Sequence, residues 1–222
     1  MNVAPITEVI ASRGLFLARN GKALFIKKHG QSVNLASVKT QTSCINTNNP
    51  DQWLFLIEGH KRYHSGENLY LDKMAEELKI VTEDPIDPPF TSQVSEEASV
   101  DKIVAALAVL VMDYFDFIEQ NHNIEETPEE TLEILFHNSL DAVAKAFGVN
   151  VKALRKQFQE LNWQDEHSLA EQLKVLSLKR KQLIDVSNSR SRINLARILN
   201  MHRHPNLFIM SGIEHKPVFV ES

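Results

Sequence analysis

A chain of 222 residues, 43% of them hydrophobic, is long enough to bury a substantial core, as one elaborated domain or two small ones. Its net charge of -5 excludes a general affinity for nucleic acid or anionic membranes, so a partner of either kind would have to bind a local basic patch. The single cysteine, Cys44, excludes an internal disulfide and favours a reducing compartment.

No segment has the pattern of a membrane span or a secretion signal. The longest apolar run, 103–112, is well short of the roughly 20 residues that a bilayer span needs. Pro5 and Glu8 precede any basic residue, and no long apolar stretch follows them. We expect a soluble, cytoplasmic protein without a nucleic-acid partner, although export by a signal-independent route would leave the same sequence. The oligomeric state is left open.

The N-terminal third predicts strands that alternate with helical connections. Short apolar runs over 23–26, 53–57 and 79–82 predict three strands. The segment 31–50 is long enough for a crossover between parallel strands. An amphipathic helix follows the second strand, and its apolar side consists of Leu69, Tyr70, Met74, Ala75 and Leu78. This order is typical of a parallel sheet.

The middle of the chain, 91–186, predicts a helical insertion after a proline-rich exit from the sheet. The first predicted helix is apolar nearly all round, so we expect it to lie buried at the centre of the insertion. A polar interruption near 187–189 is expected to separate the last helical stretch into two. The predicted helices span 101–121, 127–147, 151–161 and 168–200.

The C-terminal segment, 187–222, predicts a final helix and a strand over 207–215 that ends in glycine and histidine. An edge strand over 216–220 is expected to follow, with Pro217 at its start. The predicted fold class is therefore α/β: a mostly parallel sheet assembled from 1–90 and 187–222, with 91–186 inserted as helices.

Acidic and imidazole side chains stand where the predicted strands end. His29, Glu58, Glu83 and His215 each follow an apolar run, and the ends of parallel strands meet at one rim of a sheet, where ligands usually bind. Glu and His at such a rim can ligate a divalent metal or activate water. Glu58 is the strongest candidate, because a carboxylate directly after Leu-Phe-Leu-Ile is costly to bury without a partner.

Each of the other strand-end residues also has an ordinary structural interpretation. His29 follows two lysines, so a solvated strand end would explain it. Glu83 and Asp84 precede Pro85, where an exposed turn would explain both. His60 is left open between a functional and a structural role, and His64 is placed in a loop.

Basic residues offer a second group of candidates. Arg190 and Arg192 stand in the polar stretch 187–191, just before the predicted final helix, and an arginine near a helix start can hold a substrate carboxylate or a developing oxyanion. An ordinary solvated helix face is the alternative. Cys44 lies in a Ser/Thr/Asn-rich connection without a motif, so we do not expect a nucleophile there. Motifs for binding nucleoside triphosphates or dinucleotides are absent from the sequence.

Three short motifs together resemble a known superfamily. They are Gly212-Ile213-Glu214-His215 near the C-terminus, Glu58 at the end of an early strand, and Arg192-Ile193-Asn194 in the helix before the last strand. This set is similar to the superfamily that groups Tiki metalloproteases, TraB/PrgY pheromone-shutdown proteins, GumN-like proteins, erythromycin esterases and haem-binding ChaN proteins. The resemblance covers roughly the first 90 and last 30 residues. Ile26 stands where the family has the glycine of a first Gly-x-x-His ending at His29.

The resemblance implies hydrolysis of an amide or ester in a small-molecule or peptide substrate, metal-assisted or by acid/base chemistry. His29 and His215 would ligate a divalent metal or shuttle protons, Glu58 would ligate the metal or activate water, and Arg192 would steady the oxyanion. Haem is a further ligand by analogy alone. The loss of the first motif glycine leaves a second hypothesis open, a non-catalytic relative that binds a ligand or a protein partner.

Overall fold

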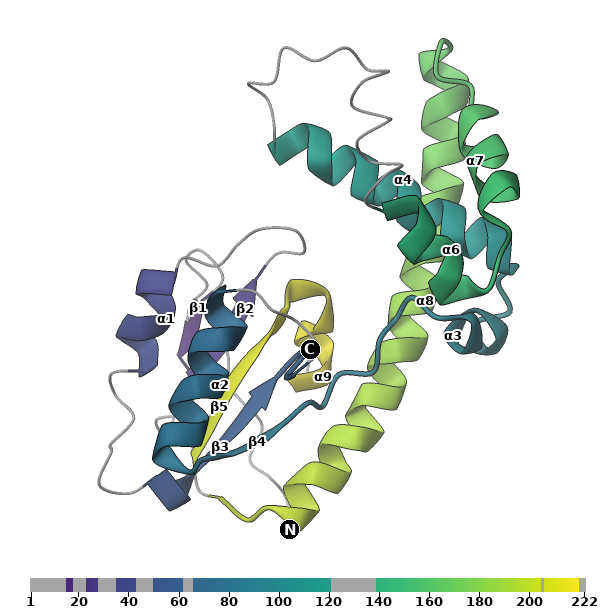
Figure 1. Cartoon of the computed structure of the whole chain (residues 1–222). Helices are drawn as coiled ribbons and strands as arrows, with labels where there is room; N and C mark the ends of the chain where they lie inside the picture. Colours follow the sequence, from purple (N-terminus) through teal and green to yellow (C-terminus); the bar gives the residue numbers. More distant parts are fainter. Residues whose placement is uncertain are drawn as a thin grey trace. The chain divides into compact units, whose positions relative to one another are not determined.

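The computed structural model describes residues 15–17, 23–27, 35–42, 50–61, 66–120, 139–204 and 206–219 (Figure 1). The chain divides into two compact units, one formed by 1–87 with 188–222 and the other by 88–187. The divisions fall beside the expected boundaries at 90 and 186. His29 and the two connections that contain Cys44 and His64 lie outside the described residues.

The first unit is built on a sheet that, in the described part of the chain, has five strands in the order β1-β2-β5-β3-β4 (Figure 1). β1 is antiparallel to β2, and every other pairing is parallel. This arrangement confirms the predicted α/β class with a sheet assembled from the N-terminal third and the C-terminal tail. The strands are β1 (Leu15–Leu17), β2 (Ala23–Lys27), β3 (Trp53–Ile57), β4 (Val81–Glu83) and β5 (Asn206–Gly212).

The C-terminal strand β5 lies between β2 and β3, although it is the last strand in the chain. Leu54 is in register with Leu207 and Ile57 with Met210. All five residues of β3 are buried, as expected for a strand covered on both faces of a parallel sheet. The register therefore brings the residue after β3, Glu58, to the carboxyl end of β5.

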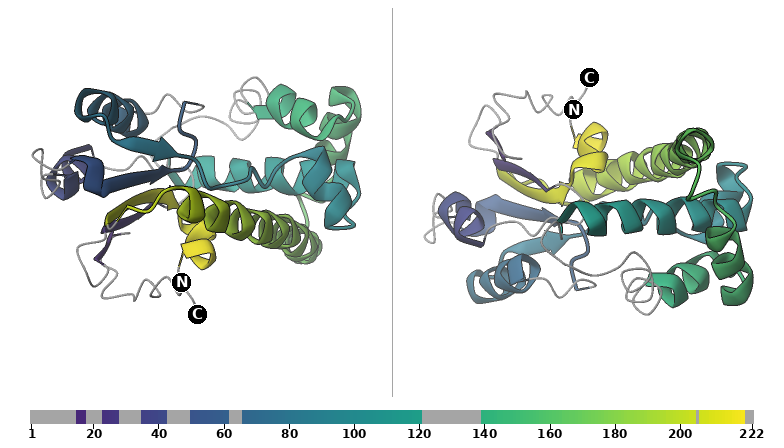
Figure 2. Two further views of the ribbon diagram at one scale, coloured as in Figure 1. Left: turned by 90° about the horizontal axis from the view of Figure 1, so that it is seen from below. Right: turned by 90° about the horizontal axis from the view of Figure 1, so that it is seen from above.

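Alternation along the strands divides the core of this unit into two layers, one on each face of the sheet. Figure 2 shows the helices on the two faces. One layer packs under α1 (Leu35–Thr42) and α2 (Gly66–Leu78) and comprises Val38, Trp53, Phe55, Ile57, Leu71, Ala75, Ile80, Phe208 and Met210. The other comprises Leu54, Leu56, Ile86, Ile198, Leu207, Ile209, Val218 and Phe219, and packs under the C-terminal part of α8 (Glu166–Met201) and under α9 (Lys216–Phe219). Glu58 continues the Leu54–Leu56 series, so its side chain belongs to the α8 side.

One strand of this unit was not predicted, and two expectations are wrong in detail. The N-terminal strand β1 was not predicted, because three residues carry no readable period. In α2 the side chain of Leu69 is 52% exposed and Leu71 is buried instead, because the helix turns its Leu71–Ala75 face to the sheet. The expected edge strand over 216–220 is α9, in which Pro217 occupies the first turn, where no backbone N–H is needed.

The expected interruption near 187–189 is also wrong, because α8 runs without a break through these positions. Ser187, Asn188 and Ser191 are buried in the helix. The hydroxyl of Ser191 accepts a hydrogen bond from the backbone N–H of Asp87, 2.9 Å away. The polar residues therefore mark a buried, hydrogen-bonded face of the helix and not its end.

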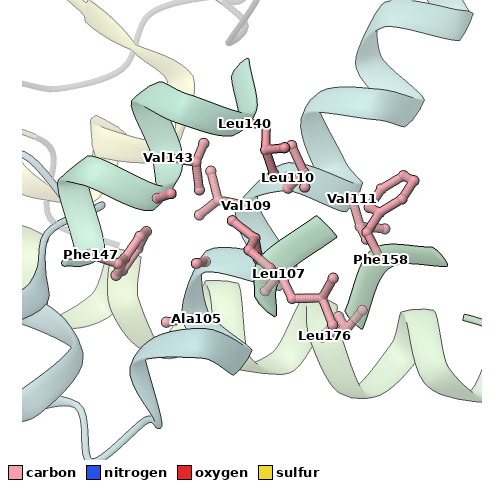
Figure 3. Close-up of a cluster of buried hydrophobic side chains, with 14 of the residues drawn as sticks. Ala105, Leu107, Val109, Leu110, Val111, Leu140, Val143, Phe147, Phe158 and Leu176 are labelled. Carbon is pink, nitrogen blue, oxygen red and sulfur yellow. The ribbon is translucent and has the colours of Figure 1, made fainter. Parts of the chain in front are cut away.

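The second unit is helical. Its core is one apolar cluster, and Figure 3 shows the side chains that converge in it. The segment 105–111 of α4 is buried throughout, which agrees with the helix predicted to be apolar nearly all round. Among the helices that the structure describes, none has the length and apolar character needed to cross a membrane. The elements are α3 (Ser92–Glu97), α4 (Lys102–Gln120), α6 (Asp141–Phe147), α7 (Val151–Gln159) and the N-terminal part of α8.

Three aromatic side chains pack together in one part of this core. The ring of Tyr114 meets the rings of Phe158 and Trp163 edge to face, at centroid distances of 5.8 and 5.3 Å. The indole N–H of Trp163 donates to the carbonyl of Phe158 at 3.0 Å, so its polar group is satisfied. Burial raises the pKa of the Tyr114 hydroxyl.

The ring contact between Phe55 and Phe208 gives a test of the pairing between β3 and β5. The centroids are 5.1 Å apart. We expect Phe55→Leu and Phe208→Leu each to lower the free energy of unfolding by about 1–2 kcal/mol. A double-mutant cycle measured by urea denaturation should give a coupling energy between the two substitutions of about 0.5–1.5 kcal/mol. The exposed control Leu69→Ala should change stability by less than about 0.5 kcal/mol. Strict additivity of the two core changes would contradict the pairing.

Candidate active site

The chain turns sharply as it leaves β3. Gly59 and Lys61 both have left-handed backbone conformations, with φ of 73° and 59°. The N–H of Gly59 donates to the carboxylate of Asp84 at 2.8 Å, and the side-chain amide of Asn68 donates to the carbonyl of Glu58 at 3.1 Å. The turn is therefore held from two sides, by the segment that follows β4 and by α2.

The side chain of Glu58 closes the end of β5. Its backbone N–H extends the ladder by donating to the carbonyl of Met210 at 2.9 Å, and its Oε2 accepts the N–H of Gly212 at 2.5 Å. The Glu58 side chain is only 13% exposed, so this bond supplies a partner that a buried carboxylate requires. A Cβ at Gly212 would lie 3.3 Å from the same oxygen, so a side chain there would force this oxygen to move by a few tenths of an ångström.

His215 lies beside this carboxylate, at the end of the 3-10 turn η3 (Ile213–His215). Its Nε2 is 3.7 Å from Oε1 of Glu58, and its Nδ1 is 2.7 Å from Oδ1 of Asn188 in α8. The Asn188 side-chain N–H donates to the carbonyl of Glu214 at 3.0 Å, which directs the amide oxygen to the imidazole. Because that oxygen can only accept, Nδ1 carries a proton, and Nε2 is the nitrogen directed at Glu58.

This geometry suits proton transfer or a metal. A separation of 3.7 Å is longer than a direct hydrogen bond. Two ligand atoms of one tetrahedral zinc ion, each about 2.1 Å from it, lie roughly 3.4 Å apart. Asn188 holds the second ring nitrogen, as the outer partners of metal-bound histidines do. The described residues contain no group of three or more His, Cys, Asp or Glu side chains close enough to hold a metal, and the predicted third ligand, His29, lies outside them.

The two adjacent carboxylates at the end of β4 go to different places. Oε1 of Glu83 lies 2.9 Å from Nε2 of His202, just after the end of α8. In the described part of the chain the partner of Glu83 is therefore His202, and not His215. Asp84, its neighbour in the chain, is the one that contacts the turn after β3.

The two arginines also have partners other than Glu58. Arg192 is exposed, and its Nε and Nη2 donate to the carbonyl of Pro217 at 3.1 and 2.9 Å, which fastens α9 to α8. Arg190 forms an ion pair with Asp87. Asn194 of the proposed motif donates to the carbonyls of Asp84 and Pro85, both at 3.2 Å. Arg192 therefore contacts the backbone of α9 and Arg190 contacts the side chain of Asp87, and both contacts lie within the first unit.

His60, which the sequence left open, points to α2. Its Nδ1 lies 2.6 Å from the Asp72 carboxylate, and the His60 side chain is 16% exposed. The pair fastens the turn after β3 to the α2 side of the sheet, whereas Glu58 lies on the α8 side. The structure thus brings Glu58 and His215 together and adds Asn188, which the sequence analysis missed. A polar residue on an otherwise buried helix face was the available signal.

Comparison of the chain with protein-family models, curated proteins and solved structures gave no match. The superfamily resemblance therefore stays a prediction from short motifs, and the site must be interpreted from its own geometry.

Replacing Gly212 tests the contact that organises the site. We expect Gly212→Ala to lower the free energy of unfolding by about 1–3 kcal/mol, because the new methyl group would push Glu58 away from the amide that it accepts. Gly66→Ala is the matched control, since a Cβ there meets nothing within 4 Å at the exposed start of α2. It should be neutral or stabilising by up to about 1 kcal/mol. Thermal denaturation of both variants measures the difference, and equal stability of the two would contradict the proposed contact.

Proposed function

We propose that Glu58 and His215 form a hydrolytic site for an amide or ester bond. The observation that supports this most is the 3.7 Å approach of His215 Nε2 to Glu58 Oε1, with the imidazole oriented by Asn188. The pair stands at the carboxyl ends of two neighbouring parallel strands, where open α/β sheets commonly bind their ligands. The substrate class, a small molecule or a peptide, follows from the motif resemblance alone.

Each residue has a distinct role in this proposal. His215 accepts a proton at Nε2 from the attacking water and returns it to the leaving amine or alkoxide as the scissile bond breaks. Asn188 keeps the proton on Nδ1 in place. Glu58 faces the imidazolium that forms and stabilises its charge, while its other oxygen is fixed by Gly212. A divalent metal held by Glu58 and His215 would polarise the scissile carbonyl and lower the pKa of a bound water.

Burial favours a second candidate, a non-catalytic relative that binds a ligand or protein partner. The His215 side chain is 2% exposed, and the Glu58 carboxylate already accepts a strong hydrogen bond from within the fold. In that case the pair would tie the ends of β3 and β5 to α8, and recognition would occur elsewhere on the surface.

Hydrolysis assays separate the two candidates. With nitrophenyl esters and nitroanilide peptides, with and without added Zn²⁺ or Mn²⁺, we expect turnover by the wild type and a loss of kcat of about 100-fold or more in Glu58→Gln. The control Glu77→Gln changes an exposed carboxylate on α2, paired only with Lys73 at 3.8 Å in the described structure, and should leave kcat unchanged. Equal rates in wild type and Glu58→Gln, or no turnover by folded wild type, would favour the non-catalytic candidate.

A further inference from the structure

Helices α6 and α7 are joined by a short turn that is hydrogen bonded at both of its ends. Gly148 ends α6 in the left-handed conformation, with φ of 65°. Its N–H donates to the carbonyl of Lys145 at 3.2 Å, and the N–H of Val149 donates to that of Ala144 at 2.9 Å, a Schellman pair. Asn150 then caps α7 by accepting the N–H groups of Lys152 and Ala153. Three residues therefore join the two helices with little freedom.

The inner sides of both helices are fixed by the core of the second unit. Val143 and Phe147 of α6 and Phe158 of α7 converge with side chains of α4 (Figure 3). Leu154 of α7 is fully buried in the same cluster. Two helices joined by a short glycine-containing turn and packed on a third helix are also the elements of helix-turn-helix modules. In those modules the second helix, the position of α7 here, is the recognition helix.

The outer side of α7 is basic. Lys152, Arg155, Lys156 and Gln159 follow the spacing i, i+3, i+4, i+7, so they share one side of the helix, opposite Leu154 and Phe158. Lys152, Lys156 and Gln159 are exposed and Arg155 is half-buried. α7 contains no acidic residue, although acidic residues outnumber basic ones in 88–187 as a whole. This is the local basic patch that the net charge of the chain requires for any nucleic-acid partner.

We propose that α7 binds double-stranded DNA by entering the major groove. A nine-residue helix is about 14 Å long, and the major groove, about 12 Å wide, admits it end-on or lengthwise. Lys and Arg bind phosphates and guanine, and Gln binds adenine, so the outer face carries suitable side chains. Lys156 lies 3.5 Å from Glu160 in an ion pair whose side chains are both exposed, and such a pair is weak enough to exchange for a phosphate. The proposal does not depend on the hydrolytic site.

Fluorescence anisotropy with the full chain and a labelled mixed-sequence duplex of about two helical turns tests this proposal. We expect binding at low salt and a linear fall of log affinity with log salt concentration. Lys152→Ala/Arg155→Ala/Lys156→Ala should weaken binding at least tenfold and reduce the magnitude of the salt slope by about 3, since each phosphate contact contributes about 0.9. The control Lys174→Ala/Lys179→Ala/Lys181→Ala removes the same charge from α8 in the same unit and should change neither value appreciably.

Three results would overturn the proposal. The first is no binding to the duplex by the wild type at low salt, which would direct attention to an acidic protein partner for this face. The second is an equal loss of affinity in the two triple variants, because attraction would then come from overall charge. The third is equal affinity for double-stranded RNA, whose major groove is too deep and narrow for a helix. Circular dichroism melting confirms that each variant remains folded.

Discussion

The hydrogen bond from the Gly212 amide to the Glu58 carboxylate is the interaction on which the first unit depends. It joins residues 154 positions apart, with the whole helical unit between them in the chain. The ladder from Leu54 to Ile57 and from Leu207 to Met210 brings the two strand ends together, and the carboxylate completes it where the ladder stops. The same contact holds Glu58 beside His215, so the integrity of the fold and the geometry of the proposed site are coupled.

Much of the fold could be predicted from residue patterns. The uninterrupted apolar run of β3 indicated a strand covered on both faces, and the order of strands and helices indicated parallel pairing. The approach of Glu58 to Gly212 and His215 agrees with the expectation that strand ends share a rim. A buried strand, a carboxylate after it and a glycine before a histidine are local features, and local features are what a single sequence displays well.

The remaining parts depend on contacts between distant segments. Asn188 and Ser191 resemble a helix break in sequence, because only the packed structure shows their partners, His215 and the Asp87 backbone. Glu83 and Asp84 are adjacent and chemically similar, and only tertiary packing decides which of them contacts the turn after β3. Likewise, the negative net charge of the whole chain gives no sign of the basic face of α7. That face becomes evident only when the opposite face of the helix is seen to be buried.

The amide proton chemical shift of Gly212, compared by NMR between the wild type and Glu58→Gln, tests the central contact most directly. A carboxylate acceptor forms a stronger hydrogen bond than a neutral amide, so the account predicts a downfield Gly212 resonance that moves upfield in the variant. Amide shifts in α7, which belongs to the other unit, should stay unchanged. An unchanged Gly212 shift would contradict the account, because Glu58 would then not be the acceptor that joins the two strand ends.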